Sequence, residues 1–181
     1  MPSPLIHTSL AFAAGHQCGR EREHPLRMRD FVALVFASNA HDLDFIPGLF
    51  TESVTQYHHL ASHSLLFCVV LALGCYAVTR RLFVPLLLVS LSHPIIDLLT
   101  VDLYCQYTTH WGIPLLWPFS DKAFWPVLPV FACPYVGGDM ARLFSWVNVK
   151  VALRELVVVA ACALVYAMCW RGVLFHRNNT K

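Results

Sequence analysis

The sequence predicts an all-α protein, a polytopic bundle of membrane helices with about five helical segments. Hydrophobic residues make up 57% of its 181 positions and charged residues only 13%, whereas soluble domains carry about 25% charged residues. Three apolar runs are almost free of charge, and the stretch between the last two has no sustained periodicity. A formal net charge of +2 gives no electrostatic footprint for nucleic acid. We expect one integral-membrane domain, residues 1–181.

Each predicted segment follows from a local pattern. A spanning helix needs about 17–25 residues, so three runs are expected to be full spans: residues 64–79, 82–100 and 151–170. Weaker helical patterns at residues 4–18 and 30–40 predict an N-terminal hairpin. Residues 101–148 are rich in Pro, Trp and Gly. They are expected to form a structured outer loop, because Trp and Tyr favour the headgroup level of a membrane.

The seven cysteines do not form the framework of a disulfide-rich protein. Four lie inside apolar runs, where cysteine usually acts as a small hydrophobic residue. Cys105 and Cys133 lie in the predicted loop, and the sequence leaves open whether they pair.

Lysine and arginine are distributed unevenly, and this orients the predicted helices. Cytoplasmic loops carry an excess of basic residues. An up-and-down arrangement puts nine of them on one side, namely Arg20, Arg22, Arg27, Arg29, Arg80, Arg81, Arg171, Arg177 and Lys181. The other side receives four, Lys122, Arg142, Lys150 and Arg154. The first side is therefore predicted to be cytoplasmic.

Polar residues recur at one depth in these helices. His63 lies 17 residues before the basic turn at residues 80–81, and Asp97 lies 16 residues after it, which places both roughly 25 Å from that turn. Glu155 lies at a similar depth on the last helix, and His7 and Asp42 occupy matching positions in the N-terminal hairpin. We expect a cluster near the non-cytoplasmic face.

The types of residue at this depth are typical of a metal site. The candidates are His7, Asp42, Asp44, His58, His59, His63, His93 and Asp97. Ionisable groups within membrane helices are costly and indicate function, and imidazole with carboxylate suits Zn²⁺. His93 and Asp97 are four residues apart and share a helix face. Spacing leaves the partner of His63 open, because His59 is four residues away and His58 would have to precede the helix. Histidines that only pack are the alternative.

Four stretches resemble the successive motifs of a known family. They are "HDLDFIPGLF", "YHHLASHSLLF", "SLSHPIIDLLTVD" and "GIPLLWPFSDKAF". In this order they are similar to motifs of the inner-membrane-associated metal-dependent hydrolases of the LexA-regulated type, which are distantly similar to zinc-dependent phospholipases C. The resemblance runs from His7 to about Phe124 and continues more loosely through the last helix.

The resemblance implies a ligand set. By position, the metal ligands are His7, Asp42, Asp44, His58, His63, His93 and Asp97. It therefore selects His58 rather than His59 as the partner of His63. The chain departs from the pattern at three positions, where His41 replaces a proline, His59 an arginine and Leu60 a glycine. If the arginine binds an anionic substrate, the loss at position 59 bears on substrate choice.

These observations predict a membrane-embedded, metal-dependent hydrolase that cleaves a phosphoester of a membrane lipid, with one or two ions, expected to be zinc. Asp121 and His110, both from the outer loop, are candidates for the general acid or base; Asp121 is equally consistent with a turn. A divalent-metal transporter or sensor is the alternative function, and a purely structural membrane protein is the third. The sequence does not fix the oligomeric state.

Overall fold

The computed structural model confirms the all-α class. It describes residues 4–21, 26–48, 50–51, 57–101, 112–125, 131–132 and 145–179. Its long helices are α1 (Pro4–Glu21), α2 (Met28–Asn39), α4 (Leu65–Thr79), α5 (Phe83–Leu98) and α6 (Trp146–Asn179). Shorter helical turns are η1 (Ala40–Asp44), α3 (Phe45–Gly48) and η2 (Ala61–His63). The two-residue strands β1 (Thr100–Val101) and β2 (Phe131–Ala132) pair in parallel.

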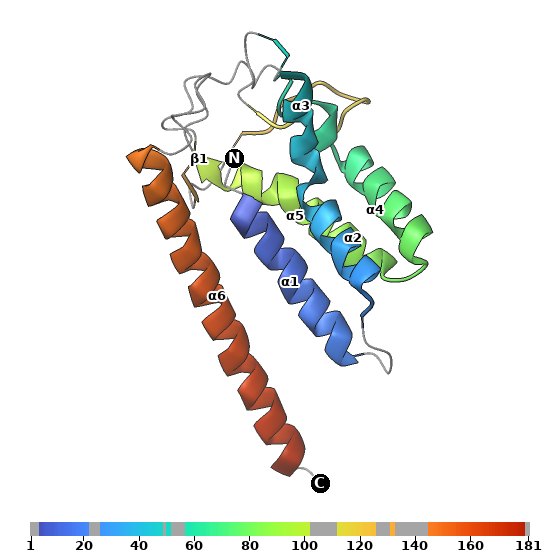
Figure 1. Cartoon of the computed structure of the whole chain (residues 1–181). Coiled ribbons are helices and arrows are strands. Elements are labelled where there is room, and N and C mark those ends of the chain that lie inside the picture. The colour runs from blue at the N-terminus through green and yellow to red at the C-terminus, as the bar shows by residue number, and fades with distance from the viewer. Residues whose placement is uncertain are drawn as a thin grey trace.

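Four of the helices form one bundle. α1 packs along α2, α5 contacts α1, α2 and α4, and the long α6 extends beside α1 and contacts it (Figure 1). The centre is apolar and is built largely from small side chains, Ala33 and Ala37 of α2 and Ala72 of α4, around the fully buried Leu34 and Leu86. Small residues let the helix backbones approach closely, so α2 can pack against both α4 and α5.

The start of α4 is fixed by its own sequence. The Ser64 hydroxyl accepts a hydrogen bond from the Phe67 amide at 3.1 Å and so caps the helix. The polar turn η2 therefore ends where the apolar helix begins, and His63 lies at that junction. The cap holds His63 at the end of the bundle.

A buried ion pair stabilises the other end of the bundle. Asp30, in the first turn of α2, is fully buried, and its Oδ2 lies 3.3 Å from Nη1 of Arg81 in the α4–α5 turn. Arg29 adds a bond to the Thr79 carbonyl at 3.3 Å. These contacts join the start of α2 to the α4–α5 turn, within the end that the sequence predicts to be basic.

The structure changes two details of the predicted organisation. α6 begins at Trp146 and runs to Asn179, so it takes in the last residues of the predicted loop and extends beyond the predicted span 151–170. α4 and α5 have 15 and 16 residues. Among the described residues, no helix combines the length and apolar character needed to cross a bilayer. Cys105 and Cys133 lie outside the described residues.

Candidate metal centre

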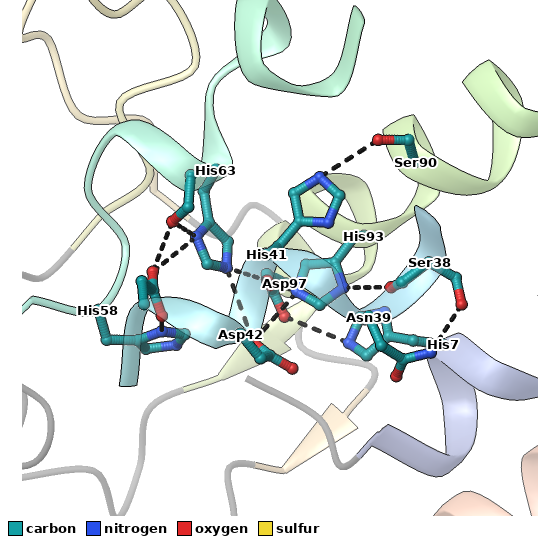
Figure 2. Close-up of polar contacts among 12 residues, drawn as sticks. His7, Ser38, Asn39, His41, Asp42, His58, His63, Ser90, His93 and Asp97 are labelled. Carbon is teal, nitrogen blue, oxygen red and sulfur yellow. Dashed lines mark hydrogen bonds and ion pairs between the residues drawn. The ribbon is translucent and has the colours of Figure 1, made fainter. Parts of the chain in front are cut away.

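Four segments that are far apart in the sequence meet at one end of the bundle. α1 contributes His7 near its start, η1 contributes Asp42, η2 contributes His63, and α5 contributes His93 and Asp97 near its end (Figure 2). α1 begins at this end and α5 finishes there, so the first turns of α1 meet the last turn of α5. The cluster therefore forms where depth counting predicts it.

Imidazole and carboxylate groups alternate at the centre of this cluster. Asp97 Oδ2 lies 3.3 Å from His63 Nε2 and 3.4 Å from His93 Nε2. Its other oxygen, Oδ1, faces His7 Nε2 at 3.8 Å. Asp42 Oδ1 lies 3.3 Å from His93 Nε2 and 4.0 Å from His63 Nε2. Each carboxylate thus faces at least two ring nitrogens.

The same atoms are buried without hydrogen-bond partners in the described part of the chain. They are both ring nitrogens of His7, Nε2 of His63 and His93, and both oxygens of Asp42 and Asp97. Buried polar groups in folded proteins are nearly always paired. Two overlapping sets of ligand atoms lie within 4.8 Å of one another: His7, His93 and Asp97, and Asp42, His63 and His93. These residues fit a divalent cation by type, spacing and lack of other partners.

Asp44 supports the centre from one side. Its Oδ1 lies 2.9 Å from His58 Nδ1, and its Oδ2 accepts a hydrogen bond from Ser62 at 2.5 Å and lies 3.3 Å from His63 Nδ1. Ser62 Oγ is also 2.9 Å from His63 Nδ1. Both Asp44 oxygens are therefore engaged, and the Nδ1 contact turns Nε2 of His63 toward Asp42 and Asp97.

His93 and His41 are held by the neighbouring helices. His93 Nδ1 donates a hydrogen bond to the Ser38 carbonyl at 2.7 Å, which leaves Nε2 as the nitrogen with a lone pair. Metal-ligating histidines usually make such a second contact. His41 is fully buried and stacks on His93 with ring centroids 4.5 Å apart. Its Nε2 lies 3.4 Å from Cys68 Sγ and from Ser90 Oγ, so α4 and α5 fix its ring.

Three carboxylates make the centre negatively charged, which favours a bound proton or cation. Burial opposes the charged form of His63, but the Asp44 and Asp97 carboxylates, each 3.3 Å from one of its ring nitrogens, raise its pKa to about 9. Burial favours the neutral form of Asp44, yet hydrogen bonds with His58 and His63 outweigh it and lower the Asp44 pKa. A proton on His63 thus balances part of the negative charge. A divalent cation would balance the same negative charge, and its binding would release that proton.

The least buried side chains of the cluster come from η1. His7, His63 and His93 are fully buried, whereas the Asp42 and Asp44 side chains are 15% and 11% exposed.

All seven residues of the predicted ligand set lie at this end of the bundle. Of the two predicted proton-carrying residues, Asp121 is exposed on the described loop 112–125, and His110 lies outside the described residues. Glu155 is buried on α6. The sequence patterns do not indicate that Ser62 and the Ser38 carbonyl orient histidine rings of the cluster. The position of Ser62 next to His63 is a signal that could have indicated its role. A backbone carbonyl is present in every residue, so residue type gives no signal for the Ser38 contact.

One comparison with known proteins identifies a family. A family model described as the YdjM inner membrane protein matches residues 1–176. The chain belongs to this family. Comparison with curated proteins and with solved structures finds no match. Membership of the YdjM inner membrane protein family agrees with the inner-membrane part of the resemblance seen in the sequence.

Replacing Asp44 by Asn tests whether this residue orients the rings or binds an ion itself. Loss of an outer partner costs about 10–100-fold in metal affinity, so we expect D44N to weaken Zn²⁺ binding by that factor and not to abolish it. Zn²⁺ affinity measured by competition with a chelator checks this. S62A, which removes the hydroxyl between Asp44 and His63, should weaken binding less than D44N. A complete loss of Zn²⁺ binding in D44N would instead make Asp44 a direct ligand.

Proposed function

We propose that this member of the YdjM inner membrane protein family is a metal-dependent hydrolase that cleaves a phosphoester of a membrane lipid or a lipid-like molecule. The observation that supports it best is the convergence of three imidazole Nε2 atoms and two carboxylates, all buried and without hydrogen-bond partners in the described chain. Purely structural histidines would be expected to have such partners.

The donor set accounts for the chemistry that hydrolysis needs. Zn²⁺ lowers the pKa of bound water to about 7 and polarises a phosphoryl oxygen. The chain's own residues hold the donors in place: Asp44 fixes the His58 and His63 rings, and the Ser38 carbonyl fixes His93. Asp121 or His110 is proposed to carry the proton as general acid or base.

A lipid substrate fits the surface around the centre. One face of α4 exposes a continuous series of large apolar side chains, Leu65, Leu66, Val69, Val70 and Leu73. Soluble monomers rarely expose large contiguous apolar patches. The cluster lies where α5 ends and α4 begins, whereas the Asp30–Arg81 pair joins the start of α2 to the α4–α5 turn at the opposite end of the bundle. We therefore propose a multi-pass protein of the cytoplasmic membrane, with the centre near its non-cytoplasmic face.

The test combines metal analysis with a hydrolysis screen. The full chain, purified in detergent, is expected to hold stoichiometric zinc or another divalent metal and to release the headgroup from one of a panel of phospholipids. A chelator should abolish the release, and added metal should restore it. Protein that holds no metal and cleaves no lipid in the panel would overturn the proposal.

Divalent-metal transport is the alternative function that the same assay can separate. Between the metal centre and the basic end, the bundle is filled by the packed apolar side chains of Leu34, Ala72, Leu86 and Val89, whereas transport needs access from both faces. Uptake of metal into proteoliposomes, in the absence of lipid hydrolysis, would favour transport over the proposed reaction.

A further inference from the structure

A third group of ligand atoms lies beside the metal centre. His58, His59 and His63 each offer one ring nitrogen, and these nitrogens lie within 4.8 Å of one another. The three ring centroids form a triangle, with 3.9 Å between His58 and His59, 4.8 Å between His59 and His63, and 4.9 Å between His58 and His63. His63 also belongs to the Asp42–His93 group, so the two positions adjoin.

Two of these nitrogens are free for a ligand in the described part of the chain. His58 uses Nδ1 for Asp44, and its Nε2 is buried without a hydrogen-bond partner. His59 Nε2 is likewise buried without such a partner. The His58 ring cannot turn easily, because it stacks on Phe45 with centroids 4.0 Å apart. Pairing with a protein group therefore does not explain why these two nitrogens lie next to each other.

The backbone at His59 is also held in an uncommon conformation. Its φ is 60°, in the left-handed region that residues with a Cβ seldom adopt. Such conformations persist where surrounding contacts over-determine them, and they concentrate at functional sites. Here the turn directs the His59 ring against the His58 ring.

We propose that His58 and His59 form an additional metal position beside the carboxylate-rich centre, with His63 shared or adjacent. Its protein ligands are imidazoles alone, which suit late first-row divalent ions such as Zn²⁺, Ni²⁺ and Cu²⁺ better than Mn²⁺. His59 is half-buried, and Asp44, which contacts its neighbour His58, is partly exposed. An ion here would contact an oxygen of a substrate phosphate group, a role that rests on the proposed function.

Replacing His59 by Asn separates this position from the rest of the centre. Asn tolerates the left-handed region better than most residues, so the turn is expected to survive. After equilibrium dialysis of the full chain against Zn²⁺, H59N should contain one zinc fewer per chain than the wild type. The matched control is H16N, which removes an exposed histidine of α1 and should leave the zinc content unchanged.

Dialysis against Mn²⁺ adds a readout that a packing role would not change. The wild type is expected to bind one ion fewer with Mn²⁺ than with Zn²⁺, whereas H59N should bind equal numbers of both. If H59N holds as much zinc as the wild type, this inference is wrong and the proposed hydrolase still stands. If the wild type holds no metal with either ion, the proposed function and this inference both fail.

Discussion

Replacing Asp97 by Asn is expected to abolish metal binding and hydrolysis. Asp97 lies at the centre of the cluster, with one oxygen toward His7 and the other toward His63 and His93. Asn keeps the shape but removes the negative charge and exchanges one oxygen for an amide donor. We expect Zn²⁺ affinity to fall by more than about 100-fold, the upper end of the loss caused by removing an outer partner. Competition with a chelator measures the affinity, and headgroup release measures hydrolysis.

The matched control for this variant is D121N. Asp121 is exposed on the loop 112–125, so its replacement should leave the metal content unchanged, even if loss of a proton carrier lowers the rate. A D97N protein that keeps both wild-type metal content and activity would show that the cluster is not the catalytic centre.

Replacing Arg81 by Met is expected to cause the largest loss of stability. Arg81 lies 3.3 Å from Asp30, whose side chain is fully buried. Removing one member of a buried pair leaves an uncompensated charge and costs about 3–5 kcal/mol. Arg29 Nε stays 3.9 Å from the other Asp30 oxygen, so a loss of about 3 kcal/mol, the lower end of that range, is expected. Unfolding by denaturant in detergent measures the free energy.

Two further variants show whether the unpaired charge is the cause. Arg80 adjoins Arg81 but is exposed, so R80M should change the unfolding free energy much less. D30N/R81M removes the charge on Asp30 and retains an oxygen that can accept from the Arg27 amide, which bonds Asp30 at 3.1 Å. The double variant should recover part of the stability lost in R81M. Equal losses in R81M and R80M would contradict the explanation.

Much of the fold could be predicted because the apolar runs are long and their ends are marked by polar residues. The predicted segment 64–79 corresponds to α4, and the segment 82–100 contains α5. The prediction was poorer for α6, whose start lies inside the predicted loop. Asn148 and Lys150 interrupt the apolar pattern just before residue 151, so hydropathy alone placed the start too late.

The spacing of residues along the chain is enough to predict which end of the bundle carries the polar cluster. Helix rise is constant, so counting residues from Arg80 and Arg81 places His63 and Asp97 at one depth, and the structure puts their side chains 3.3 Å apart. The contacts that each group makes follow instead from how the helices pack. This packing engages both oxygens of Asp44 with His58, His63 and Ser62, buries His41 against His93, and pairs His93 with the Ser38 carbonyl. Depth depends on position along one helix, whereas ring orientation and pairing depend on contacts between helices, which one-dimensional spacing does not contain.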